Sequence, residues 1–157
     1  MFKIGERIVY PMHGAGKIEC IESKTILDET RDYYVLKVPY GTIKLMIPVD
    51  KAEEIGVRPV IDSAMVDEVI EILKAPSSAM PANWNKRHRE NMEKLKTGDI
   101  KQVAEVVRNL TRADEKKHLS TGERKILTNA RQILQSEIML AADMPEDEAE
   151  NLIDSAL

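Results

Sequence analysis

The sequence contains very little cysteine, tryptophan or phenylalanine, with one residue of each among 157. The single Cys20 excludes an intramolecular disulfide framework and any multi-cysteine metal site, which fits a reducing compartment. Its position in an apolar strand pattern predicts a small buried side chain rather than a nucleophile. No hydrophobic run approaches the roughly 18 residues that a membrane span needs, and the first residues lack an apolar run of signal-peptide length. We therefore expect a cytoplasmic protein that does not bind membranes.

Residues suited to catalysis or metal binding are also scarce. The three histidines, His13, His88 and His118, lie in three separate segments, and none has a metal ligand four residues further on. The glycines around Ala15 are not followed by a helical pattern that could aim backbone amides at a phosphate. The sequence therefore predicts a protein that is not an enzyme and that uses neither a cofactor nor a metal.

The net charge of −4 hides a strong asymmetry along the chain. Residues 82–131 contain thirteen Lys and Arg against seven Asp and Glu, whereas residues 132–157 contain seven acidic residues and no basic one. The basic segment is therefore the candidate for contact with nucleic acid, since phosphate contacts are made by Lys and Arg.

The first third of the chain has the pattern of short strands. Apolar residues alternate with polar ones at Ile8 and Tyr10, at Ile18 and Cys20, at Tyr34, Leu36 and Val38, and at Ile43, Leu45 and Ile47. Glycines in residues 13–16 and 39–41 supply the positive φ of hairpin turns, and residues 27–30 form a polar loop. We predict a small antiparallel β domain over residues 1–58. Because such a sheet buries little surface, it should curl into a barrel or lean on a partner.

After Pro59 the apolar residues follow the helical period, which predicts an all-helical domain of about five helices over residues 59–157. The expected helix starts are Ser63, Asn83, Asp99 with Gln102, the capping box Ser120-Thr121-Gly122-Glu123, and Pro145. The predicted fold class is therefore α+β.

The start of the second of these helices concentrates groups that suit DNA. The candidate DNA-binding residues are Trp84, Asn83, Lys86, Arg87, Arg89 and Lys94. Basic side chains contact phosphates, and a large aromatic ring can stack on or wedge beside an unpaired base. The alternative is structural: on a helical wheel Trp84, Asn91 and Leu95 point in nearly one direction, so that Trp84 belongs to the core and the bases form a solvated face.

Two blocks of the sequence resemble the CarD/CdnL family of bacterial RNA polymerase regulators. The first is Gly5-Glu6-Arg7-Ile8-Val9-Tyr10-Pro11-Met12-His13-Gly14-Ala15-Gly16. The second runs from Asn83-Trp84-Asn85-Lys86-Arg87 through Asn91-Met92-Glu93-Lys94-Leu95-Lys96-Thr97-Gly98-Asp99 and Val103-Ala104-Glu105-Val106-Val107-Arg108 to Leu119-Ser120 and Gly122-Glu123. The resemblance covers essentially the whole chain. It implies a Tudor-like N-terminal domain, shared with transcription-repair coupling factor, and a helical C-terminal domain.

The resemblance also implies partners. In the family the first domain binds the RNA polymerase β subunit, through basic side chains in its second and fourth strands. Those positions here are Lys24 and Met46. Met46 departs from the pattern, which leaves Lys24, Lys44 or the hydrogen bonds of a strand edge to make the contact. In the helical domain, the tryptophan at the position of Trp84 wedges into the minor groove of promoter DNA at the upstream edge of the transcription bubble.

These features together predict a monomeric transcription regulator that binds polymerase and stabilises the open promoter complex. The rival hypothesis is a protein–protein adaptor, in which the helical domain docks a second protein and its basic face is incidental.

Overall fold

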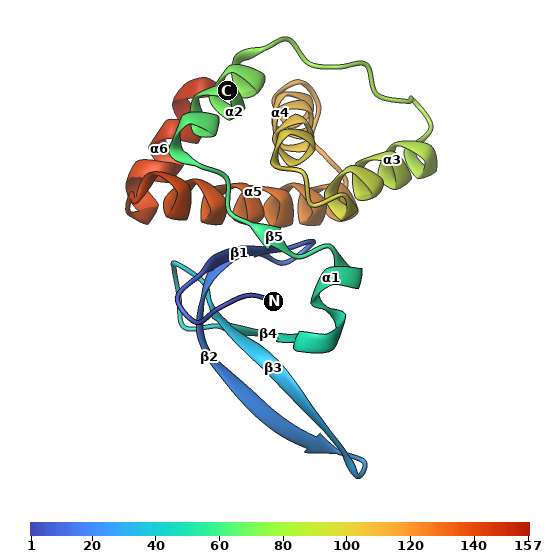
Figure 1. Cartoon of the computed structure of the whole chain (residues 1–157). Helices are drawn as coiled ribbons and strands as arrows, with labels where there is room; N and C mark the ends of the chain where they lie inside the picture. The colour runs from blue at the N-terminus through green and yellow to red at the C-terminus, as the bar shows by residue number, and fades with distance from the viewer.

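The computed structural model describes residues 1–157 and has an antiparallel sheet followed by a helical domain, which confirms the predicted α+β class (Figure 1). The strands are β1 (Arg7–Tyr10), β2 (Gly14–Ile26), β3 (Glu29–Lys37), β4 (Lys44–Pro48) and β5 (Arg58–Pro59). Their order in the sheet is β4-β3-β2-β1-β5, so β4 and β5 are its edges. Strands β2 and β3 continue as a long hairpin that projects away from the helices (Figure 1).

The tip of this hairpin is tighter than the predicted polar loop. Only Leu27 and Asp28 lie outside the strands, and both have positive φ (52° and 63°), as in a type I′ turn. The Leu27 side chain is 95% exposed. The right-handed twist of the strands favours such a turn even where, as here, neither residue is glycine.

The predicted alternation fails in the middle of β2. The pairing with β3 shifts between Ile18 and Cys20, so Glu19 is an extra residue in the strand. Ile18 is buried, whereas Cys20 is half-buried, and the prediction of a buried cysteine is therefore wrong. A bulge changes which face the following side chains occupy, and sequence periodicity does not reveal it.

Glycine is needed for different reasons at two positions near the first turn. Gly14 has a φ of +116° and lies against helix α5, where an added Cβ would be 3.0 Å from Ser136 Oγ. Gly16 is an ordinary strand residue, but a Cβ there would lie 2.6 Å from Leu36 Cγ and 2.8 Å from the Lys37 carbonyl oxygen. Close packing, rather than the turn geometry we predicted, therefore explains Gly16.

A short helical segment that sequence periodicity did not indicate closes the sheet: the 3₁₀ helix η1 (Val49–Lys51) and α1 (Ala52–Ile55). Its Ala52, with the nearby Val57, packs against Ile8, Leu36 and Ile47 to form the core of the β domain. The small domain thus covers one face of its own sheet.

The helical domain contains five helices, as predicted: α2 (Ser63–Lys74), α3 (Trp84–Lys96), α4 (Ile100–Lys116), α5 (Thr121–Ala142) and α6 (Glu146–Ala156). The caps at Asn83, Asp99 and Ser120 lie where the sequence indicated them. The first helix is capped one residue earlier than predicted, because the Asp62 carboxylate accepts a hydrogen bond from the Met65 amide and Ser63 is the first helical residue. No helix has the length and hydrophobicity needed to cross a membrane.

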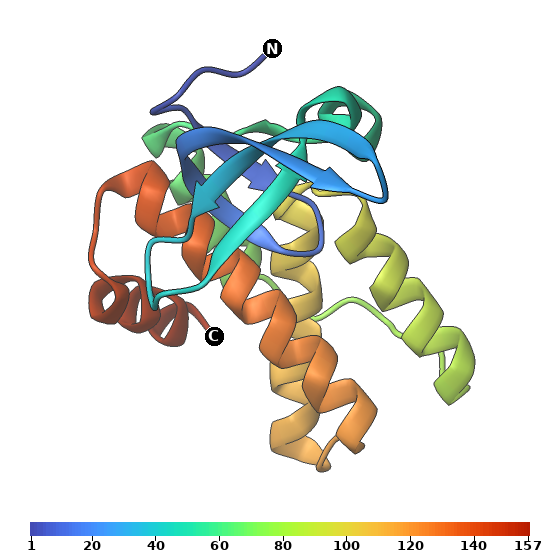
Figure 2. The same ribbon diagram turned by 90° about the horizontal axis from the view of Figure 1, so that it is seen from below.

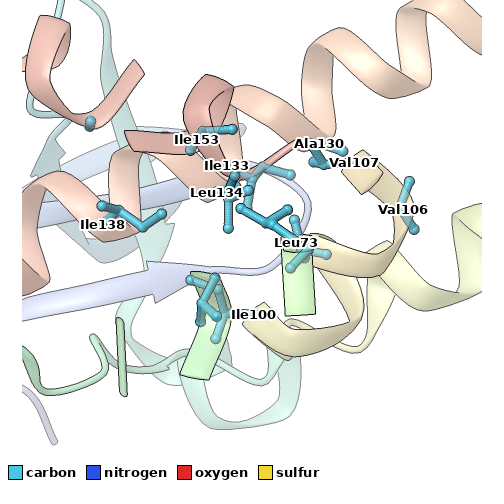
Figure 3. Close-up of a cluster of buried hydrophobic side chains, with 14 of the residues drawn as sticks. Leu73, Ile100, Val106, Val107, Ala130, Ile133, Leu134, Ile138 and Ile153 are labelled. Carbon is cyan, nitrogen blue, oxygen red and sulfur yellow. The ribbon is translucent and has the colours of Figure 1, made fainter. Parts of the chain in front are cut away.

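The core of this domain lies where α2, α4, α5 and α6 meet (Figure 3). Leu73 comes from α2, Val107 from α4, Leu134 and Ile138 from α5, and Ile153 from α6. Burial of each such side chain contributes about 1.5–3 kcal/mol, so this cluster dominates the stability of the domain. Helix α3 adds Leu95 at its C-terminal end, and its first turns extend beyond the cluster.

The β domain packs against helix α5, and its strands lie across that helix (Figure 2). The Ala15 amide donates a hydrogen bond to Ser136 Oγ at 2.9 Å, and the Tyr40 hydroxyl donates to the Gln132 carbonyl oxygen at 3.1 Å. The sheet, which we expected to curl into a barrel or to lean on a partner, thus packs against a helix of its own chain.

A buried ion pair joins the two domains. Arg58 in β5 donates to both carboxylate oxygens of Glu137 in α5, each at 2.7 Å, and its Nε donates to the Gly98 carbonyl oxygen at 2.9 Å. The Ile61 amide donates a third hydrogen bond to Glu137, whose side chain is 1% exposed. The link between sheet and helices is therefore a specific contact with fixed geometry.

Candidate nucleic-acid interface

Helix α3 begins at the basic, amide-rich segment that the sequence singled out. The Asn83 side-chain oxygen accepts a hydrogen bond from the Lys86 amide at 3.0 Å and so caps the helix. Asparagine suits this position because its short side chain reaches the free amides of the first turn. The cap fixes where the helix starts and therefore the direction in which Trp84, its first residue, projects.

Trp84 lies at the surface with 43% of its side chain exposed, so the alternative in which it is a core residue is wrong. Its indole Nε1 donates a hydrogen bond to Ser120 Oγ at 3.1 Å, and its ring stacks on that of His88 with 5.1 Å between centroids and 25° between planes. Asn91 and Leu95 share its side of the helix and are buried. The first turn of α3, however, lies beside the start of α5, beyond the core.

Arg87 is turned into the protein. Its Nε and one terminal nitrogen donate to the two carboxylate oxygens of Glu123 at 2.7 and 2.9 Å, and its other terminal nitrogen approaches the Pro81 carbonyl oxygen at 3.3 Å. The hydrogen bonds from Arg87 lower the pKa of the Glu123 carboxyl below its usual value, and those to Glu123 raise the pKa of Arg87. Glu123 is only 4% exposed, which makes this a buried pair.

The other predicted DNA-binding bases differ in how free they are. The side chains of Lys86 and Arg89 are exposed and form neither an ion pair nor a side-chain hydrogen bond. Lys94 is half-buried, with its Nζ 3.5 Å from a carboxylate oxygen of Glu105 in α4. Of the predicted DNA-binding bases, Lys86 and Arg89 are therefore the two whose charges remain available to a phosphate.

The turn between α4 and α5 lies against the start of α3, which the sequence pattern did not indicate. A cavity of 620 Å³ next to Arg87 is lined by the segment before α3 and by the turn between α4 and α5, with Lys117, His118 and Ser120 among its residues. The capping box of Ser120 was recognisable in the sequence. Its contact with an indole 36 residues away was not, because side-chain pairing between helices leaves no local pattern.

The candidate polymerase-binding residues do not form one cluster. Lys44 and Met46 lie on the edge strand β4, and Lys44 forms an ion pair with Glu19 at 2.8 Å. This contact raises the pKa of Lys44 and lowers that of Glu19. Lys24 pairs with Arg31 far along the hairpin, whereas Lys44 is level with Lys37, six residues further along β3. At about 3.3 Å per residue, this offset separates Lys24 from the level of Lys44 by roughly 20 Å.

Comparison with known families agrees with this two-part architecture. A model of the CarD C-terminal domain matches residues 68–154, and a model of the CarD-like/TRCF RID domain matches residues 2–61. The chain belongs to the CarD family. A similar protein from Bacillus subtilis (strain 168), named "Putative transcription factor YdeB", is 40% identical over 146 residues, which cover 93% of this chain and 95% of that protein. This CarD-family chain is therefore a transcription regulator.

Proposed function

We propose that this CarD-family protein binds the β subunit of RNA polymerase through its β domain, residues 1–58, and stabilises the open promoter complex through its helical domain, residues 59–157. Trp84 inserts at the upstream edge of the transcription bubble, where the base pairs are already distorted. Lys86 and Arg89 contact the adjacent phosphates.

The observation that carries the proposal is the exposure of Trp84 in a helical segment that also holds two free cations. A tryptophan that is 43% exposed is unusual for so large an apolar side chain, which a monomeric protein normally buries. The ring is at the first turn of α3, and Lys86 and Arg89, whose charges have no partner within the protein, follow within the next five residues of the same helix. An exposed aromatic ring on the same short helix as unpaired cations suits a nucleic acid that offers both an unstacked base and phosphates.

The mechanism requires no covalent chemistry. A wedge that fits the melted junction and not the intact duplex binds the open complex more tightly than the closed one, so it shifts the equilibrium toward the open form. Stacking of one base on an aromatic ring is worth about 1–3 kcal/mol, which corresponds to roughly five- to 150-fold in the ratio of the two forms. The β domain supplies high local concentration by holding the protein on polymerase.

The β4 edge supports the polymerase contact. Since β4 is the last strand of its sheet, its outer backbone groups have no strand partner and can pair with a strand of another protein. Lys44 and Met46 lie on this edge. We propose that backbone pairing along β4 replaces the cation that the family carries at the position of Met46.

Two full-length variants test the polymerase contact. Lys44→Glu should weaken capture of polymerase in a pull-down, because it places an acidic side chain at the β4 edge beside Glu19. Lys24→Glu introduces the same charge change far along the hairpin and should affect capture less. Equal capture by both variants and the wild type would argue against the β4 edge.

DNA binding is tested with labelled forked promoter DNA and the matched duplex. The wild type should prefer the forked DNA, and Trp84→Ala should lose that preference while remaining folded by circular dichroism. A wild type that shows no preference for the fork, together with a Trp84→Ala variant that no longer captures a second protein, would favour the adaptor hypothesis.

A further inference from the structure

The Trp84 indole is held by groups from two helices before any DNA is present. We propose that Ser120, His88 and the Arg87–Glu123 pair are positioning residues that fix the orientation of this ring, so that the wedge is preformed. This inference rests on the proposed function of Trp84. It also assigns to Arg87 a role different from the phosphate contact predicted from the basic segment of the sequence.

Ser120 both caps helix α5 and binds the Trp84 indole. Its Oγ accepts the Glu123 amide at 3.2 Å, which caps α5, and accepts the Trp84 indole N–H at 3.1 Å. Its own hydroxyl lies 3.3 Å from a Glu123 carboxylate oxygen, to which it donates. A hydroxyl has one proton and two lone pairs, so all three are in use and the hydroxyl cannot turn away from the indole.

The Arg87–Glu123 pair makes the second connection between the two helices. Trp84 and Arg87 are three residues apart on α3, and Ser120 and Glu123 are three residues apart at the start of α5. Residues with this spacing in a helical turn lie on one face. The contacts Trp84–Ser120 and Arg87–Glu123 therefore run side by side, and the Ser120–Glu123 contacts join them into one network.

Contacts within the protein cover one face and one edge of the Trp84 ring and leave the rest open to a ligand. His88, one turn further along α3, covers one face by stacking. The edge that carries Nε1 and Cζ2 points to α5, where Gly122 leaves room for it: a Cβ at that residue would lie 3.4 Å from Trp84 Cζ2. The rest of the ring accounts for its exposure and is what the protein can offer to a base.

Preorganisation of this kind changes binding without adding a contact to DNA. Immobilising a free side chain on binding reduces affinity by about two- to tenfold, and a ring that is already held avoids this cost. Arg87 contributes in the same indirect way, because its donors are occupied by Glu123 and by the carbonyl oxygen of Pro81.

The first test measures the motion of the indole. Trp84 is the only tryptophan, so time-resolved fluorescence anisotropy of the free protein reports on this ring alone. Ser120→Ala should increase its local motion, and Ser120→Thr, which retains a hydroxyl, should restore wild-type behaviour. Asp62→Ala removes the cap of α2 instead and provides a control of similar chemistry that leaves the indole contact in place. Equal anisotropy decays for the wild type and Ser120→Ala would overturn the proposal.

The second test connects the motion to function. In the presence of polymerase, Ser120→Ala should shorten the open-complex lifetime by about two- to tenfold, the value of one hydrogen bond, while Asp62→Ala should leave it near that of the wild type. In a Trp84→Phe background, which lacks the indole N–H, the additional effect of Ser120→Ala should disappear. An equal loss in both backgrounds would reduce Ser120 to its capping role.

The role of Arg87 is separated by salt dependence. Each phosphate contact contributes about 0.9 to the slope of log affinity for DNA against log salt. Lys86→Ala and Arg89→Ala should each lower the slope by roughly that amount, whereas Arg87→Met, which retains the packing of the side-chain stem, should leave the slope unchanged and increase indole motion. A slope lowered by Arg87→Met would make Arg87 a phosphate contact and overturn its part in the proposal.

Failure of this inference differs from failure of the proposed function. If Trp84→Ala leaves the open-complex lifetime unchanged, the wedge itself is absent. If Trp84→Ala shortens the lifetime and Ser120→Ala behaves as Asp62→Ala, the wedge acts but does not depend on this network.

Discussion

Removal of the Arg58 side chain should destabilise the protein more than any surface substitution. In Arg58→Ala, the Glu137 carboxylate loses two of its three hydrogen bonds while it remains 1% exposed, and the Gly98 carbonyl oxygen loses its donor. Leaving one member of a buried ion pair without its partner costs about 3–5 kcal/mol. Single domains have about 5–15 kcal/mol of stability in total, so the variant should unfold at a clearly lower urea concentration.

The reverse variant has a smaller predicted effect. Glu137→Ala leaves Arg58, whose side chain is 28% exposed and can be partly hydrated. The loss should therefore lie nearer to about 1.5–3 kcal/mol, the value of hydrogen bonds to a charged group. Replacing both residues, in Arg58→Met with Glu137→Leu, should recover part of the loss, because an apolar pair leaves no buried charge.

The assay is equilibrium urea unfolding followed by circular dichroism, on the wild type, Arg58→Ala, Glu137→Ala and the variant with both alanines, which form a double-mutant cycle; the Arg58→Met, Glu137→Leu protein is measured beside them. The three differences in unfolding free energy give the coupling between the two residues. A loss below about 1 kcal/mol for Arg58→Ala would place the pair in the range of solvated surface ion pairs and refute the account of a buried interdomain link.

Three further outcomes are expected. The pKa of Glu123 is lowered chiefly by the hydrogen bonds from Arg87. The pair therefore stabilises the fold fully above the ordinary carboxyl pKa of 4.5, and progressively less as the pH falls through the lowered pKa. In that acidic range, the urea midpoint of Glu123→Gln should depend less on pH than that of the wild type. Arg108 is 4% exposed, its pKa is lowered by burial, and it donates to the Ile72 carbonyl oxygen and to Ser78 Oγ. Arg108→Ala should therefore lower the unfolding free energy measured in urea by roughly 3 kcal/mol. Arg108→Lys should recover less than half of this free energy, because an ammonium group lacks the planar fork of a guanidinium. Substitution of the exposed Glu19 by Gln should leave the thermal midpoint unchanged, and a drop of several degrees would contradict this.

The features that sequence predicted are those encoded within one turn or one strand. The caps at Asn83 and Ser120 satisfy backbone amides three residues away, and these local hydrogen bonds appear as short motifs. Three helices of the second domain, α2, α4 and α5, follow from apolar residues at 3.6-residue spacing, and α3 and α6 follow from the residues that mark their ends. Asp62 took the capping role expected of Ser63 because either side chain can cap and the chain offers both in succession.

The features that sequence did not predict depend on contacts between distant segments. The periodicity of α3 places Trp84 in line with Leu95, and only the packing of α3 against α4 and α5 decides that one is exposed and the other buried. Arg58 and Glu137 are 79 residues apart, and neither belongs to a pattern that points to the other. Arg87 looked like a free cation for the same reason, although Glu123 binds it in the folded protein.

We propose that the exposed Trp84 ring holds the promoter bubble open. The most direct measurement is the lifetime of open complexes formed by polymerase with saturating wild-type protein or Trp84→Ala, after addition of a competitor that traps released polymerase. With equal amounts of both proteins bound to polymerase, the lifetime should fall at least about fivefold in Trp84→Ala, as expected for the loss of one stacking contact. Equal lifetimes for the two proteins would contradict the account.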